Sequence, residues 1–196
     1  MSKGEFARIT YEGKIKESGE VFDRGENIPI IIGEGFVIKG LDETLEKMKE
    51  GEEKTVEIPP EKAFGERSAD LVKLVPLSEF RKNNMNPYPG MVIRADNLYG
   101  RVLSVSSGRV RVDFNHPLAG KKLEYKVKIE KIIKDEKEKV LALIEFFSGR
   151  KDAEAEIKEN SAEIKVKGLP EAVKRKISEH AKKYLGLEKI IFVEEF

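Results

Sequence analysis

Apolar and polar side chains alternate along much of the chain, which is the pattern of half-buried β-strands. The alternation is longest at residues 5–16 and 122–133, and a shorter stretch of the same kind covers 53–59. Apolar runs predict further strands at residues 21–23, 28–32, 91–95, 99–106, 109–114, 155–158, 162–167 and 190–193. Turn residues separate several of them, and the sequence Glu17-Ser18-Gly19-Glu20 predicts a hairpin.

Three stretches have helical spacing instead. The first begins near Ile38 and ends before Gly51, and it places four apolar residues on one face: Val37, Leu41, Leu45 and Met48. The other two cover residues 140–147 and 170–184. Spacing alone favours an ordinary core helix for the first stretch, and the floor of an apolar pocket is the alternative.

The composition narrows the functional classes. The 196 residues carry 37 basic and 36 acidic side chains, so the net charge gives the whole molecule no attraction for nucleic acid or membranes. Cysteine is absent, which excludes disulfides and suits a reducing interior. No apolar run is long enough to span a bilayer, so we expect a cytoplasmic protein without membrane contact. The bias towards Lys, Glu and Arg favours a thermophilic source.

The middle of the chain has a different character. Residues 67–115 carry eight basic and four acidic side chains, and Pro76 predicts a bend within the apolar run 71–80. So small a unit buries little apolar area. It nevertheless contains eight apolar residues that we expect to bind unfolded chains: Val72, Leu74, Val75, Phe80, Met85, Tyr88, Met91 and Ile93. The alternative is that half of them form the core of the unit itself.

The order of these motifs resembles the FKBP family of peptidyl-prolyl cis-trans isomerases, in its SlyD-like long archaeal form. The matching residues lie within about residues 4–134: Tyr11, Phe22-Asp23, Ile32-Gly33, Phe36-Val37-Ile38-Lys39-Gly40-Leu41, Gly51, Ala63-Phe64-Gly65, Asn115-His116-Pro117-Leu118-Ala119-Gly120 and Tyr125. The resemblance implies an α+β fold, in which an antiparallel FKBP sheet is wrapped on a short helix, with a β-rich domain inserted in the flap and an α+β C-terminal domain. The implied domains are residues 1–66 with 116–135 for the isomerase, 67–115 for the insert-in-flap chaperone domain, and 136–196 for the C-terminal domain.

The resemblance also implies a proline site. Its catalytic residues would be Tyr11, Asp23, Phe64 and Tyr125, and its substrate-binding residues would be Phe22, Ile28, Val37, Ile38 and Leu41. Three positions depart from the family pattern: Leu41 stands where tryptophan is common, Phe64 where tyrosine is common, and Ile28 where an aromatic residue is common. We hypothesise that Asp23 orients Tyr11 near the reacting amide. The alternative is that Asp23 caps a turn at residues 22–25.

The implied function is an isomerase that speeds proline-limited folding and binds unfolded chains through its insertion. Rotation about an X–Pro bond changes no covalent bond, so no cofactor is implied. The two histidines, His116 and His180, are far apart in the sequence and predict no metal site. The expected partners are unfolded or partly folded polypeptides, X–Pro peptides, and a second copy of the chain bound through the C-terminal domain. Nucleic acid and membranes are not expected.

Two alternatives use the same residues. A holdase could have kept the fold and lost catalysis through the changes at Leu41 and Phe64. A ribosome-associated factor could bind RNA through the basic insertion.

Overall fold

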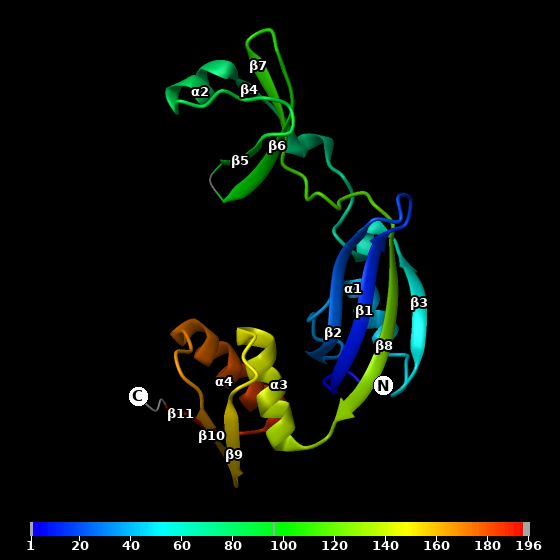
Figure 1. Ribbon diagram of the computed structural model, residues 1–196, viewed down its shortest axis with the longest axis vertical. Coiled ribbons are helices and arrows are strands. Elements are labelled where there is room, and N and C mark those ends of the chain that lie inside the picture. Colours follow the sequence, from blue (N-terminus) through cyan, green and yellow to red (C-terminus); the bar gives the residue numbers. More distant parts are fainter. Residues whose placement is uncertain (1, 96, 194–196) are drawn as a thin grey trace. The chain divides into compact units, whose positions relative to one another are not determined.

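The computed structural model describes residues 2–95 and 97–193, which divide into two compact units. The first contains the residues up to Pro59 and those from Lys122 onward, and the second is Pro60–Lys121. Both four-stranded sheets are antiparallel, and short helices accompany them (Figure 1). The predicted α+β fold class is confirmed.

The first sheet is built from four strands in the spatial order β2-β1-β8-β3. Their bounds are β1 (Phe6–Ile15), β2 (Val21–Ile31), β3 (Glu53–Ile58) and β8 (Leu123–Ile133). The runs predicted at residues 21–23 and 28–32 are one continuous strand, β2, which stays paired with β1 through two shifts in register. Pro29 is compatible with this strand because β2 lies at the edge of the sheet, where strand prolines are usually found.

Helix α1 (Lys39–Leu45) is shorter than the sequence predicts, and it packs against β3. Leu41, Leu45 and Met48 are all buried, so the apolar face of this segment belongs to the core. The chain leaves the helix through turns to Gly51, whose φ of 80° favours glycine and whose N–H donates to the Ile129 carbonyl at 2.8 Å.

The second unit has its own small core. It begins with the 3₁₀ turns η1 (Pro60–Lys62) and η2 (Ala69–Leu71), followed by β4 (Val72–Pro76), α2 (Leu77–Lys82), β5 (Val92–Ala95), β6 (Leu98–Ser106) and β7 (Arg109–Asp113). The strands form a sheet in the order β4-β7-β6-β5. The buried cluster of this unit is Phe80, Ile93, Val102, Val110 and Val112. The bend predicted at Pro76 is the point where strand β4 changes to helix α2.

The last part of the chain packs against the first sheet. Its elements are α3 (Glu136–Ser148), β9 (Glu154–Lys158), β10 (Ser161–Lys165), α4 (Glu171–Leu185) and β11 (Lys189–Val193). Their apolar side chains share one buried cluster with Phe6, Ile31 and Ile133 of the first sheet. Residue 136 is therefore the start of a helix rather than a division between compact units, and the second unit extends beyond residues 67–115 at both ends. Within the described ranges, no helix has the length and apolar character needed to cross a membrane.

Candidate functional site

Three aromatic side chains from three neighbouring strands meet on one face of the first sheet. The ring of Tyr125 lies 6.0 Å from that of Tyr11 and 5.8 Å from that of Phe22, centroid to centroid, and the second pair is edge to face. Tyr125 is almost completely buried, whereas Tyr11 and Phe22 are half-buried. The structure thus brings together the three aromatic residues that the sequence predicted on these strands.

Two glycines make room for these rings. Gly25 pairs with Tyr11 across β1 and β2, and a Cβ atom at Gly25 would lie 2.4 Å from Tyr11 Cε1. Gly13 pairs with Tyr125 across β1 and β8, and its Cβ would lie 2.9 Å from Tyr125 Cε1. Neither position was predicted from the sequence. A glycine inside an alternating strand often marks a close approach of another group, and Gly13, within the predicted strand 5–16, carried that signal.

The Tyr11 hydroxyl donates a hydrogen bond to Asp23 Oδ2 at 3.2 Å. Burial, followed by the charge of Asp23, raises the pKa of Tyr11 to about 12, so its hydroxyl remains a donor above pH 10, where an ordinary tyrosine ionises. Burial and the same carboxylate also raise the pKa of Tyr125. Residues 22–25 are strand, and Asp23 pairs with Gly13 of β1. Asp23 therefore does not cap a turn, and the contact expected between Asp23 and Tyr11 is present.

The remaining predicted substrate-binding residues come from β2 and from the start of α1. Ile28 is half-buried beside Gly25, within reach of the Tyr11 ring. Val37 and Ile38 are half-buried in the loop that leads into α1. Leu41 is only 1% exposed, so it can support a pocket from beneath but offers almost no surface to a ligand.

The loop before α1 depends on a residue that the sequence analysis did not single out. Asp42 is 7% exposed, and its carboxylate accepts the backbone N–H of Gly33 at 2.7 Å and that of Gly35 at 2.9 Å. Both glycines have positive φ. A carboxylate that accepts two backbone donors fixes the course of residues 33–35 as they approach Val37 and Ile38.

Phe64, the fourth predicted catalytic residue, belongs to the second compact unit. It stacks on His116 with ring centroids 4.4 Å apart and planes only 1° from parallel. The His116 Nδ1 atom accepts the backbone N–H of Leu118 at 3.1 Å. His116, which the sequence analysis treated as an isolated imidazole, therefore supports the Phe64 ring.

The eight residues expected to bind unfolded chains divide into three groups by their burial. Phe80 and Ile93 are buried in the core of the second unit, so the expectation that they contact clients is wrong for this structure. Val75, Met85 and Met91 are partly buried against that core, and Val72 is half-buried. Leu74 and Tyr88 are exposed, as are apolar residues that the sequence analysis did not include: Leu71, Val92, Leu98 and Tyr99.

The opposite face of the first sheet carries a hollow of about 620 Å³. Its side chains include Glu12, Arg24, Lys126 and Lys128, which alternate along their strands with the aromatic cluster and so point the other way. Ion pairs such as Lys126–Glu53 and Lys128–Glu130 occupy this face. An apolar proline ring is better matched by the aromatic face. The described residues contain no group of three or more metal-ligating side chains.

Comparison with known proteins gives the family. The family profile described as FKBP-type peptidyl-prolyl cis-trans isomerase matches residues 1–83, and the profile described as FKBP26, IF domain, matches residues 73–118. The short-type peptidyl-prolyl cis-trans isomerase of Methanocaldococcus jannaschii is 34% identical over 147 residues, which cover 67% of this chain and 94% of that protein. This chain belongs to the FKBP-type peptidyl-prolyl cis-trans isomerase family.

Other FKBP-type proteins agree with this assignment. The SlyD isomerase of Helicobacter pylori is 30% identical over 143 residues, or 69% of this chain and 77% of that protein. The probable FKBP-type 16 kDa isomerase of Pseudomonas fluorescens is 35% identical over 103 residues, or 50% and 67%. The three FKBP domains of wheat FKBP73 align over 68% of this chain and 40% of that chain, at 22% identity and a TM-score of 0.39, which adds nothing to the assignment. The predicted FKBP resemblance with SlyD-like relatives is confirmed, and the chain is an FKBP-type peptidyl-prolyl cis-trans isomerase.

Proposed function

We propose that X–Pro segments are isomerised against the cluster of Tyr11, Phe22 and Tyr125, with Val37 and Ile38 completing the apolar surface. The observation that carries the proposal is the Tyr11–Asp23 hydrogen bond at the edge of this cluster, because it joins one charged group to an otherwise apolar site. Rotation about the X–Pro bond faces a barrier of about 18–20 kcal/mol. The site must therefore bind the twisted amide more tightly than either planar form.

Twisting removes the resonance of the amide, so the carbonyl becomes less polar and the nitrogen more pyramidal. Aromatic surfaces that exclude water favour this less polar state over the hydrated planar amide. The Tyr11 hydroxyl donates its hydrogen bond to Asp23, which holds the ring in place. We assign to Asp23 the orientation of Tyr11 and an electrostatic contact with the reacting amide. The catalytic role of Phe64, which stacks on His116 within the second unit, stays a prediction.

The test is a protease-free isomerisation assay on short X–Pro peptides with three variants. Asp23→Leu and Tyr11→Phe remove the two ends of the hydrogen bond, and Glu26→Leu removes another exposed carboxylate of β2 as a matched control. Loss of one charge-assisted contact in the transition state lowers kcat/KM by about tenfold. Asp23→Leu and Tyr11→Phe should both show this loss, and Glu26→Leu should not. An unchanged rate in Asp23→Leu would remove Asp23 from the site.

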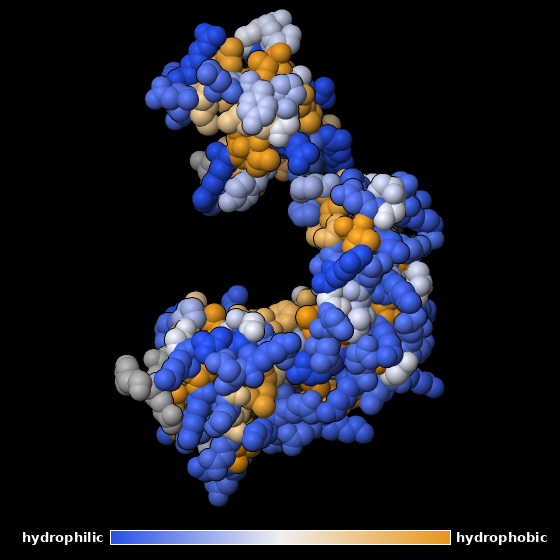
Figure 2. Space-filling model, viewed as in Figure 1, coloured by the Kyte–Doolittle hydropathy of each residue, from blue (hydrophilic) through white to orange (hydrophobic). Residues whose placement is uncertain are grey.

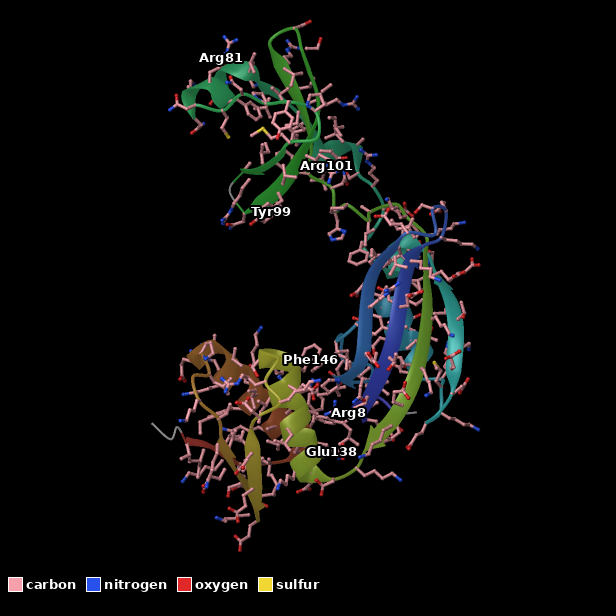
Figure 3. The ribbon with its side chains drawn as sticks, viewed as in Figure 1. Arg8, Arg81, Tyr99, Arg101, Glu138 and Phe146 are labelled. Carbon is pink, nitrogen blue, oxygen red and sulfur yellow. The ribbon has the colours of Figure 1, made fainter. Side chains whose placement is uncertain are left out.

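We also propose that the second unit binds unfolded clients through the uncovered face of its sheet. Leu74, Val92 and Tyr99 lie on this face and are between 59% and 66% exposed. The register places Leu74 opposite Arg111 and Val92 opposite Arg101, whereas Ile93, Val102 and Val112 point to the buried side. Apolar residues gather over β5 and β6, and Tyr99 and Arg101 both project from β6 (Figures 2 and 3).

The composition of this face suggests which clients it selects. Exposed apolar residues favour the apolar segments of unfolded chains. Arg94, Arg101 and Arg111 stand among them on the same face, and Arg94 lies 6.0 Å from the centre of the Tyr99 ring. Clients in which acidic residues flank apolar stretches should therefore be held more tightly than basic clients of the same hydrophobicity.

Two experiments test this second proposal. Deleting residues 67–115 should slow the refolding of an unfolded protein with a slow proline step while leaving turnover of a short X–Pro peptide unchanged. Leu74→Ser should weaken client binding, whereas Lys73→Ser, the next residue of β4 on the opposite face, should not. Equal effects of the two variants would refute the assignment. If the intact protein bound clients but did not isomerise the peptide, the holdase alternative would be favoured. RNA affinity that depends on salt concentration and on Tyr99 and the neighbouring arginines would favour the RNA-binding alternative.

A homodimer through the C-terminal elements is a further part of the proposal. Strands β9 and β11 are the two edges of the three-stranded sheet, and an unpaired strand edge is a template for pairing with another chain. Sedimentation of the intact protein over a range of concentrations tests it, and a single monomeric species throughout would exclude the dimer.

A further inference from the structure

The loop of residues 33–38 lies between β2 and α1, and its last two residues are Val37 and Ile38. A loop of this length would ordinarily be one of the more mobile parts of a site. On one side it is fixed by the buried carboxylate of Asp42, which accepts the N–H groups of Gly33 and Gly35. Its other side chains contact helices that are remote in the sequence.

Glu34 is held by residues of α4. The Tyr184 hydroxyl donates to Glu34 Oε2 at 2.5 Å, and Lys183 Nζ donates to the same oxygen at 2.9 Å. The Glu34 side chain is only 14% exposed, and Lys3 Nζ lies 3.9 Å from its second oxygen. The hydrogen bond from Tyr184, and then that from Lys183, hold the pKa of Glu34 below its ordinary value, so both contacts stabilise the charged carboxylate. This contact joins the loop to a helix 149 residues further along the chain.

Phe36 makes the second contact, two residues further along the loop. Its ring lies 4.3 Å from that of Phe146, 5.9 Å from that of Phe147 and 5.7 Å from the His180 imidazole, centroid to centroid. Phe146 and Phe147 end α3, and His180 belongs to α4. Phe146 projects from the end of α3 beside the first sheet (Figure 3). Phe36 is thus inserted among aromatic rings of both C-terminal helices.

We infer that α3 and α4 act as a clamp that positions the loop of the isomerase site. Glu34 and Phe36 are alternate residues of the loop, and both are held by the C-terminal helices. Val37 follows Phe36 directly, so the position of the Phe36 backbone sets where Val37 and Ile38 stand. A loop ordered before substrate binds loses less conformational entropy on binding, which lowers KM. The inference rests on the proposed assignment of Val37 and Ile38 to the proline site. It makes Glu34, Phe36, Phe146 and Tyr184 positioning residues.

The test uses the intact chain and three substitutions in the C-terminal helices. Tyr184→Phe removes only the hydroxyl that binds Glu34, and Phe146→Ala removes the ring nearest Phe36. Leu143→Val is the matched control, because Leu143 is 1% exposed in the same helix and cluster but is not one of the rings around Phe36. Two quantities are measured well below the melting temperature. One is hydrogen–deuterium exchange over residues 33–38, and the other is the pair kcat and KM for a short X–Pro peptide.

The expected result is faster exchange in the loop and a fall of about threefold to tenfold in kcat/KM for Tyr184→Phe and Phe146→Ala, chiefly through a higher KM. The control should lower thermal stability and leave both quantities unchanged. Phe146→Leu, which keeps an apolar side chain at the contact, should recover part of the loss. The clamp is overturned if the two variants behave like Leu143→Val, or if exchange rises while kcat/KM stays the same. If Asp23→Leu and Tyr11→Phe also leave kcat/KM unchanged, the proposed site itself has failed.

Discussion

The packing of Tyr11 against Gly25 gives a direct test of the site geometry. Replacing Gly25 by Ala would place a methyl carbon 2.4 Å from Tyr11 Cε1 and 2.7 Å from Ile28 Cγ1. Carbon atoms in contact normally stand about 3.5–4.0 Å apart, so the ring must move by about 1 Å. The Tyr11 hydroxyl is 3.2 Å from Asp23 Oδ2, and a displacement of that size takes it beyond hydrogen-bonding distance.

The free-energy cost has three parts. Overpacking costs about 1–3 kcal/mol, and loss of the exposed hydrogen bond costs about 0.5–1 kcal/mol. Replacing a strand glycine by alanine returns about 0.5–1 kcal/mol of unfolded-state entropy. The net destabilisation should be about 2 kcal/mol, which lowers the melting temperature of a domain of this size by about 4–8 °C. Isomerase activity should fall with it, since Tyr11 is displaced from the site.

A double-mutant cycle in urea separates this steric effect from any other cause. In a Tyr11→Ala background the ring that the new methyl group approaches at 2.4 Å and 2.9 Å is gone and the close approach to Ile28 remains, so Gly25→Ala should cost much less than it does in the wild type. We expect a coupling energy of about 1–2 kcal/mol between the two substitutions, at an unchanged m-value. Additive effects would mean that the Tyr11 ring does not lie on Gly25, and the geometry of the site would have to be abandoned.

Three further predictions concern charged groups around the site. Because the pKa of Tyr11 is raised to about 12, the stability that its protonated form contributes is present below about pH 10, the ordinary tyrosine pKa, and is lost as the pH rises towards 12. In ultraviolet titrations Asp23→Asn should lower the Tyr11 pKa without restoring its ordinary value, since burial is the larger cause. An unchanged titration would contradict the contact between Tyr11 and Asp23. Arg8→Met leaves the Glu145 carboxylate, 2.8 Å from Arg8 and 11% exposed, with Lys151 as its remaining ion-pair partner among the described residues, so urea unfolding should show a loss of about 1–3 kcal/mol at neutral pH. Burial tends to raise the pKa of Glu145, but Arg8 and Lys151 together outweigh it and the pKa is lowered, so this loss should shrink as the pH falls below about 4.3. Asp42→Asn places an NH₂ group against a backbone N–H of the loop and should cost about 1–3 kcal/mol in the same assay; an unchanged urea midpoint would show that the loop holds its course without the carboxylate.

The local elements of this fold could be read from the sequence because their causes are local. Alternation at residues 5–16 and 122–133 requires extended chain with one buried face, and those stretches became β1 and β8. The helix starting at Glu171 and ended by Gly186 follows from its capping residues. The end of α1 was harder to place, because the helix ends at Leu45 while Met48, in the turns that follow, is still buried and continues the apolar spacing.

Contacts between distant segments could not be predicted in the same way. Whether an apolar residue of the second unit faces the core or the solvent depends on strand register, which a single sequence does not specify. Ile93 of β5 is therefore buried although it has the same apolar character as Leu74 of β4, which is exposed. The need for Gly13 and Gly25 likewise appears only when Tyr125 and Tyr11 are placed opposite them in the sheet.

The departures from the family pattern acquire a physical meaning once these contacts are known. A reaction without a nucleophile or cofactor depends on the shape of its site and on the exclusion of water from it. Loss of aromatic surface at the base of the proposed site must therefore be offset by more rigid positioning of its other side chains. Leu41 supplies a buried base rather than a contact surface. The side walls of the proposed site are positioned by other contacts. Tyr11 and Tyr125 pack on glycines, and the loop before Val37 is held by Asp42 on one side and by α3 and α4 on the other. Releasing the loop should lower substrate affinity by more than Leu41→Trp raises it, because the position of Val37 and Ile38 limits binding more than the depth of the pocket does.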